Sequence, residues 1–367
     1  MKNIYGNYLT VTLFGESHGP YVGAVLDGIA PGIPVREETI RKEMDKRRAE
    51  GDISTSRKET DEVKIISGVK DGFTEGTPLT VLIENRNVRK EDYQETEHLA
   101  RPGHADYTAE LKYLGYQDHS GGGHFSGRLT SPLVALGAIV KEALEEKGIL
   151  IGTHIAELHD LKDDTFDAKQ YPEQIRLLNE KKFAVLNEES GEKMKEAIRS
   201  AAKDNDSLGG ILETVVYGLP GGIGEPYFDS LESTLAHGLF SIGGIKGVEF
   251  GSGFEFSKMK GSEANDPLRI ADGKAITLEN HAGGINGGIS NGMPIVIRCA
   301  VKPTSSIAKT QQTIDYKTLE DATLSLTGRH DPAIIHRARV VVDAVVALTL
   351  ADALIARYGY LWLRSEK

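Results

Sequence analysis

Cysteine is almost absent from the 367-residue chain, which contains Cys299 and no other. A single cysteine excludes an intrachain disulfide and is typical of proteins from a reducing compartment. A long hydrophobic run is also missing, because the most apolar stretch, at 340–350, contains Asp343 and is too short to cross a bilayer. Residues 1–14 have no small-residue cleavage site, so no signal peptide is predicted. We therefore expect a cytoplasmic protein that does not span a membrane.

An excess of positive charge is also lacking, since 43 Lys and Arg stand against 54 Asp and Glu and the net charge is −11. Non-specific nucleic-acid binding requires a basic face, so we expect no nucleic-acid partner. The acidic total does not exclude a small anionic ligand, because a local arginine cluster can bind one inside an acidic surface. Walker spacing is absent, which disfavours a P-loop nucleotide enzyme.

Glycine is abundant, with 41 residues that gather in short runs typical of tight turns and of backbone close to ligands. Strand and helix patterns alternate along the chain without a break in composition, which predicts a single α/β (α+β) domain over 1–367. The final predicted helix is apolar on nearly every face and is expected in the core. Gly-rich stretches at 121–127 and 283–292 each precede a buried helix, which leaves an internal duplication open. Strands are predicted at 8–14, 22–26, 63–67, 79–83, 209–218, 248–250 and 294–301, and helices at 37–48, 133–146, 173–186, 192–202, 230–240 and 333–357.

Two histidines follow turns that contain glycine. His18 comes directly after a predicted strand, and His104 lies in Arg101-Pro102-Gly103-His104-Ala105-Asp106, where Asp106 can orient its ring. An imidazole has an ordinary pKa near 6.5 and can exchange a proton at neutral pH. For His18, the residues alone slightly favour a histidine that only fills a turn. For His104, an exposed ion pair in a surface turn is about as consistent with the sequence as a site.

Further loops have the chemistry of an anion site. Glycines 121–123 allow backbone N–H groups to converge on an anion ahead of a predicted helix. A strand ends at Lys302-Pro303-Thr304-Ser305-Ser306, which supplies a charge and hydroxyl donors, and Asp331 can cap the last helix. If these loops converge, they form a polyanion site with two candidate proton-transfer histidines. The nearby cations are mostly arginines, which form bidentate pairs with carboxylate and phosphate: Arg47, Arg48, Arg57, Arg101, Arg128, Lys302, Arg329 and Arg337.

In this order, the motifs resemble those of the chorismate synthase family over the whole chain. The resemblance implies a lyase that eliminates phosphate from 5-enolpyruvylshikimate 3-phosphate in an anti-1,4 reaction, the last common step of the shikimate pathway to the aromatic amino acids. It implies a requirement for reduced FMN without net redox change. It also implies a β-α-β sandwich with central helices between antiparallel sheets, in a homotetramer. The motifs are Phe14–Gly19, Arg101–Asp106, Asn280–Gly284, Lys302–Ser306 and Gly328–Pro332.

The resemblance also implies roles for individual residues. His18 is expected to protonate the departing phosphate and His104 to protonate reduced flavin. Asp331 is expected near flavin N5, which receives the C6 proton, and Ser17 belongs to the neighbourhood of His18. No metal is expected. The implied substrate-binding residues are Arg47, Arg48, Arg101, Arg128 and Arg337. The implied flavin-binding residues are His124, Phe125, Ser126, Gly243, Gly244, Gly287, Lys302, Pro303, Thr304, Ser305, Ser306 and Arg329.

Two stretches depart from the family pattern. The Gly-rich loop usually continues Arg-Ser-Ser-Ala-Arg-Glu-Thr but here reads His-Phe-Ser-Gly-Arg-Leu-Thr over 124–130, so side-chain contacts to flavin differ there. The basic stretch at 47–51 carries an additional Glu50, and the NADP contacts of some relatives are not carried over. The length suggests no flavin-reductase segment, so an external reductant of FMN is expected. Two alternatives stay open: a flavin reductase that consumes NAD(P)H, and a silent anion-binding or assembly protein.

Overall fold

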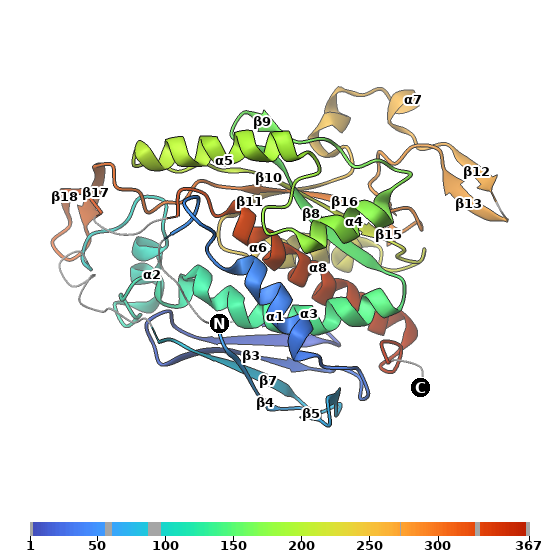
Figure 1. Cartoon of the computed structure of the whole chain (residues 1–367), viewed down its shortest axis with the longest axis horizontal. Coiled ribbons are helices and arrows are strands. Elements are labelled where there is room, and N and C mark those ends of the chain that lie inside the picture. The colour runs from blue at the N-terminus through green and yellow to red at the C-terminus, as the bar shows by residue number, and fades with distance from the viewer. Residues whose placement is uncertain (1–2, 56–60, 87–96, 272, 327–330, 365–367) are drawn as a thin grey trace.

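The computed structural model describes residues 3–55, 61–86, 97–271, 273–326 and 331–364 (Figure 1). The predicted flavin contact Arg329 and the cation Arg57 lie outside these residues. Among the described residues, no helix is long and apolar enough to cross a bilayer.

Two antiparallel five-stranded sheets enclose a layer of helices (Figure 1). The first sheet has the order β1-β2-β3-β7-β4 and the second has the order β11-β16-β10-β8-β9. This arrangement confirms the predicted α+β class with helices between antiparallel sheets. The first sheet comprises β1 (Ile4–Tyr5), β2 (Thr10–Gly15), β3 (Tyr21–Asp27), β4 (Val63–Ser67) and β7 (Leu79–Glu84). The second comprises β8 (Leu150–Leu158), β9 (Leu161–Lys162), β10 (Gly210–Tyr217), β11 (Ile245–Phe250) and β16 (Ile295–Val301).

Four helices form the middle layer: α1 (Glu37–Arg47), α3 (Thr130–Glu146), α6 (Leu231–Phe240) and α8 (Ile335–Tyr358). Helix α3 packs on β3 and β7, α8 packs on β8 and β10, and the two helices pack on each other. Their close approach depends on Gly137 of α3, where an added Cβ would lie 2.3 Å from Cβ of Ala344 in α8. Apolar residues lie on nearly every face of α8 because it contacts both a sheet and other helices.

The two halves of the chain share one topology. The first half runs β2-β3-α1-β4-β7-α3 and the second runs β8-β10-α6-β11-β16-α8. The strand order is also the same, because β2-β3-β7-β4 matches β8-β10-β16-β11. The prediction that the Gly-rich stretches at 121–127 and 283–292 hold equivalent places in the two halves is wrong, because 283–292 lies between β11 and β16. The counterpart of 121–127 is instead the connection from β16 to α8.

The remaining elements lie around this sandwich. Helix α4 (Tyr171–Glu180) packs on β8 and β10, and α5 (Glu188–Lys203) packs on β9. The helix predicted at 173–186 therefore ends six residues early, and Phe183, Ala184 and Val185 are buried in the segment that follows it. The other α-helices are α2 (Asp106–Tyr113) and α7 (Gly261–Ala264). Four short hairpins complete the strands: β5 (Val69–Lys70) with β6 (Phe73–Thr74), β12 (Leu268–Ala271) with β13 (Lys274–Thr277), β14 (Ile285–Asn286) with β15 (Ile289–Ser290), and β17 (Gln311–Asp315) with β18 (Glu320–Leu324).

Candidate active site

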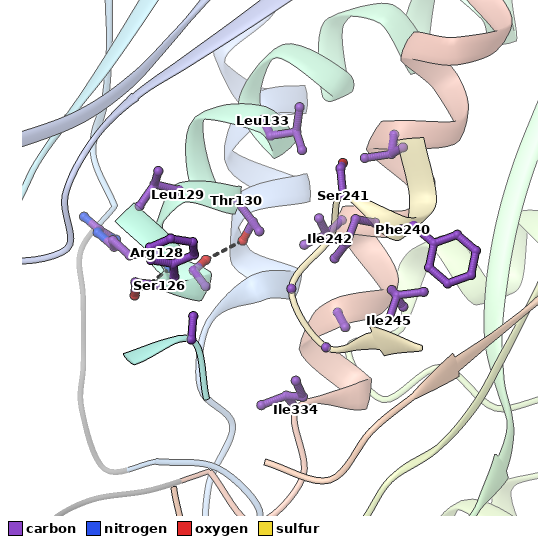
Figure 2. Close-up of a pocket in the computed structure, with 18 of the residues that line it drawn as sticks. Ser126, Arg128, Leu129, Thr130, Leu133, Phe240, Ser241, Ile242, Ile245 and Ile334 are labelled. Carbon is purple, nitrogen blue, oxygen red and sulfur yellow. Dashed lines mark hydrogen bonds between the residues drawn. The ribbon is translucent and has the colours of Figure 1, made fainter. Parts of the chain in front are cut away.

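A cavity of about 1080 Å³ lies where the two halves meet. Figure 2 shows Leu129 and Thr130 at the start of α3 across from Phe240 and Ile242 at the end of α6, with Ile334 just before α8. The amino-terminal ends of α3 and α8 both reach the cavity. Since such ends carry partial positive charge, the site favours anions before any side chain is considered.

Cationic side chains reinforce this preference. Asp331 is the one carboxylate among the described residues that line the cavity. An acidic protein therefore has a strongly basic cavity at the junction of its halves, which suits a ligand with several negative charges. The lining cations are Arg47, Arg128, Lys246, Lys302 and Arg337.

His104 lies at the wall of this cavity and is held by two neighbours. Its Nδ1 is 2.6 Å from Oδ1 of Asp106, and Asp106 also accepts hydrogen bonds from Nε of Arg101 at 2.7 Å and Nη2 at 2.6 Å. Burial would raise the pKa of Asp106, but the hydrogen bonds from Arg101 and His104 outweigh it and hold that pKa well below its ordinary value. Nη2 of Arg101 also lies 3.1 Å from Nδ1 of His104. Because Asp106 and Arg101 both contact Nδ1, Nε2 is the nitrogen left to exchange a proton.

Arg101, a predicted substrate ligand, does not line the cavity. Its Nη2 donates to the carbonyl oxygen of Gly121 at 2.6 Å, in addition to its bonds with Asp106. Arg48 does not line the cavity either, and its side chain pairs with Asp45. The three other predicted substrate-binding arginines all line it.

His18 and Ser17 lie beside the Gly-rich turn and not in the lining of the cavity. Both are buried, and Oγ of Ser17 is 3.0 Å from Nδ1 of His18. The backbone N–H of Ser17 donates to the carbonyl oxygen of Gly123 at 3.1 Å. An added Cβ at Gly121 would lie 2.4 Å from Cε1 of His18, so glycine is required for the turn to close over the ring. The structure thus brings His104 to the cavity but keeps His18 behind its wall.

Arg47 and Arg128 come from α1 and from the turn before α3, and they share the carboxylate of Asp61. Oδ2 of Asp61 is 3.2 Å from Nη1 of Arg47, while its Oδ1 accepts a hydrogen bond from Nη1 of Arg128. Burial would raise the pKa of Asp61, but the two guanidinium groups outweigh it and lower that pKa.

Asp331 does not cap α8 as predicted, since that helix begins at Ile335 without a side-chain cap. Its carboxylate accepts a hydrogen bond from the backbone N–H of Thr55 at 2.7 Å and from Nη1 of Arg337 at 2.5 Å. Nε of Arg337 donates to the carbonyl oxygen of Arg47 at 2.8 Å. These bonds tie the end of α1 to the start of α8 in the wall of the cavity.

The predicted flavin residues divide into two groups. Lys302 to Ser306, Gly243, Gly244, Phe125, Ser126 and His124 line the cavity, whereas Gly287 does not. Nζ of Lys302 and Oγ of Ser305 both contact the carbonyl oxygen of Gly103, at 2.5 and 2.9 Å, so the second half of the chain holds the loop that carries His104. Burial, together with the nearby charge of Lys246, lowers the pKa of Lys302.

Part of the cavity lining is apolar. It includes side chains such as Ile4, Val345 and Leu348. An added Cβ at Gly243 meets no atom within 4 Å, so open space adjoins the backbone there. Residues 3–55, 61–86, 97–271, 273–326 and 331–364 contain no cluster of His, Cys, Asp or Glu side chains that could hold a metal ion.

Three residues that line the cavity or contact its arginines were not predicted from the sequence. Asp61 gave no signal, because its pairing with Arg47 and Arg128 depends on tertiary structure. Lys246 follows the predicted Gly243-Gly244 pair and could have been found from it. Asn85 accepts a hydrogen bond from Nε of Arg128 at 2.9 Å, a contact that depends on tertiary structure.

A sequence model of the chorismate synthase family matches residues 9–355. The chain is 46% identical over 352 residues to the chorismate synthase of Pyrococcus abyssi, a match that covers 96% of this chain and 97% of the relative. It is 44% identical over 354 residues to that of Korarchaeum cryptofilum, with 95% and 96% covered. A solved structure described as a crystal structure of chorismate synthase is similar, with a TM-score of 0.75 and 29% identity, covering 96% of this chain and 93% of that one.

Proposed function

The chain belongs to the chorismate synthase family of carbon–oxygen lyases, and we propose that it converts 5-enolpyruvylshikimate 3-phosphate to chorismate with reduced FMN and no net redox change. The observation that carries this proposal is the basic cavity at the junction of the two halves, with His104 and Asp331 in its wall. Its volume of about 1080 Å³ is at the upper end for ligand sites, as expected for two ligands bound together.

The charged end of the cavity suits the substrate, which carries two carboxylates and one phosphate. Anions of this kind lose their hydration on binding and need several cationic partners in return. Arg47, Arg128 and Arg337 approach the cavity from α1, from the turn before α3 and from α8. We assign these three arginines to the substrate.

The remaining lining residues suit FMN. Lys302 and Ser305 supply donors for an anionic or polar group, and the aliphatic side chains suit a ring system. When bound, reduced flavin supplies electron density to an electron-deficient allylic centre. The walls of the cavity would exclude water from that centre.

We assign proton transfer to three side chains. His104 would give up a proton at Nε2 toward the reduced flavin, while Asp106 orients the imidazole through Nδ1. We assign Asp331, which is held by Thr55 and Arg337, to assist transfer of the C6 proton to flavin N5, beside which it would lie. His18 protonates the departing phosphate, which requires the turn at Gly121 to move, because that turn now covers the ring.

We further propose a homotetramer that works in the cytoplasm with an external source of reduced FMN. Tyr227 and Phe228 are 85% and 95% exposed, and Leu268 and Ile270 on β12 are each 74% exposed. Large apolar side chains of this kind are typical of protein–protein interfaces. The single cysteine, Cys299, is buried and fits a reducing compartment.

The test is anaerobic turnover of 5-enolpyruvylshikimate 3-phosphate with dithionite-reduced FMN. We expect phosphate release that depends on flavin and is matched by chorismate absorbance. An arm with oxidised FMN and NADPH tests for a flavin reductase, which would consume NADPH without the substrate. Absence of phosphate release, with flavin shown to be bound and reduced, would contradict the proposal.

A further inference from the structure

Asp61 joins two of the arginines that line the cavity. One carboxylate oxygen faces Arg47 at 3.2 Å, and the other accepts a hydrogen bond from Arg128. Asp61 is only 6% exposed and does not line the cavity itself. The carboxylate therefore lies behind the two guanidinium groups as seen from the ligand.

Neutral acceptors hold other atoms of the same guanidinium groups. Arg47 donates from Nε to Oγ1 of Thr130 at 2.9 Å and from Nη2 to the carbonyl oxygen of Gly127 at 2.6 Å. Arg128 donates from Nε to Oδ1 of Asn85 at 2.9 Å. These contacts orient each group, but they do not offset the repulsion between two cations that contact one carboxylate. Asp61 adds a negative charge that both guanidinium groups contact.

We propose that Asp61 is a positioning residue that holds Arg47 and Arg128 together as one receptor for a single phosphate or carboxylate group. The identity of the full ligand rests on the function proposed above. Two buried cations at fixed spacing bind an anion with little reorganisation, because their geometry is set before the ligand arrives. The structure places this arrangement at the end of α1 and the start of α3, two elements of the first half of the chain.

Replacing Asp61 by Asn has two opposing effects. Removing a negative charge would by itself favour an anionic ligand. However, an amide has a single acceptor oxygen, so one guanidinium group would face an N–H donor in a buried site. Loss of the paired geometry then outweighs the gain in charge, because the guanidinium group that faces the amide N–H moves away from it toward other acceptors or water.

The experiment compares wild type, Asp61→Asn and Asp61→Glu by isothermal titration calorimetry. The probes are 5-enolpyruvylshikimate 3-phosphate, inorganic phosphate and oxidised FMN, each titrated alone. We expect Asp61→Asn to weaken binding of the substrate and of phosphate by about 30-fold, as for a broken buried charge pair. Asp61→Glu keeps the charge, and we expect a loss of only about threefold to tenfold. We expect the FMN affinity to stay within about twofold of wild type, because the arginines that Asp61 contacts, Arg47 and Arg128, are assigned to the substrate.

Glu142→Gln is the matched control, because Glu142 pairs with Arg36 at 2.6 Å away from the cavity and its loss should leave all three affinities unchanged. Folding is checked by circular dichroism and thermal unfolding. If Asp61→Asn does not fold, Asp61→Ser takes its place as the variant without the charge, and wild-type substrate affinity in that variant would overturn the proposal. Equal losses in Asp61→Glu and Asp61→Asn would also overturn it, since charge would then not matter.

Failure of this inference differs from failure of the proposed function. The role of Asp61 alone is overturned if wild type forms chorismate and the folded Asp61→Asn variant binds substrate and phosphate with unchanged affinity. The paired receptor is supported, and the proposed function contradicted, if wild type binds phosphate but forms no chorismate and the Asp61→Asn variant no longer binds phosphate. A wild type that binds neither substrate nor phosphate contradicts both.

Discussion

The pair of His104 and Asp106 gives a prediction whose size can be worked from the structure. Nδ1 of His104 lies 2.6 Å from Oδ1 of Asp106, and both side chains are mostly buried. In Asp106→Asn the carboxylate that contacts Nδ1 of His104 is lost, and the amide can hold the ring in the wrong tautomer. A hydrogen bond to a charged group contributes about 1.5–3 kcal/mol to stability. Since about 1.4 kcal/mol corresponds to a factor of ten in rate, kcat should fall by about 10- to 100-fold.

The assay for Asp106→Asn is anaerobic chorismate formation at saturating substrate and reduced FMN, with kcat and KM measured across pH. We expect the loss in kcat with KM changed by less than about threefold, because the change acts on a proton-transfer group rather than on binding. The matched control is Asp160→Asn, which breaks an exposed Asp–His pair of 2.8 Å with His159 outside the site. A folded Asp106→Asn variant with wild-type kcat throughout the pH range would refute the assigned role of the pair.

Three further predictions concern packing and pH. Gly121→Ala should lower kcat by at least about tenfold, because the added Cβ would meet the ring of His18 and the φ of +64° at this position disfavours alanine. Turnover at the wild-type rate would contradict this and would show that the ring of His18 can move aside. Gly137→Ala should destabilise the protein by about 1–3 kcal/mol in urea unfolding through overpacking against α8, and an unchanged midpoint would contradict this. Burial lowers the pKa of His154, but hydrogen bonds to Asp163 and Glu213 outweigh it and raise that pKa above its ordinary value. The stabilisation from protonated His154 is therefore complete below about pH 6.5 and is lost as pH rises through the raised pKa of the folded state. Over that pH range, the unfolding free energy of wild type should fall relative to that of His154→Gln. Parallel curves of unfolding free energy against pH for the two proteins would refute this.

Much of the fold was readable from the sequence because its strongest patterns are local. Helix α8 was predicted from its apolar residues, and most predicted strands were found within a few residues. Strand β8 was missed because it is buried on both faces between α8 and α4 and shows little alternation. Helix α2 was also missed, because Asp106 to Tyr113 has little apolar periodicity.

The candidate site was predicted less completely, because its residues meet only in the folded chain. Local motifs located His104 and the lining residues from Lys302 to Ser306. They could not show that Arg101 is engaged by Asp106 and Gly121, nor that His18 lies behind the Gly-rich turn. Pairings across long sequence separations, such as Asp61 with Arg128, depend on how the elements pack, and no local pattern reports them.

The most direct test of the account is a crystal structure of the protein with FMN and 5-enolpyruvylshikimate 3-phosphate bound. We expect both ligands in the cavity between the amino-terminal ends of α3 and α8. An anionic group of the substrate should lie against Arg47 and Arg128, and the flavin should lie beside Lys302 and the Gly243-Gly244 turn. Ligands bound elsewhere, or a substrate that makes no contact with these arginines, would contradict the assignment of this cavity as the active site.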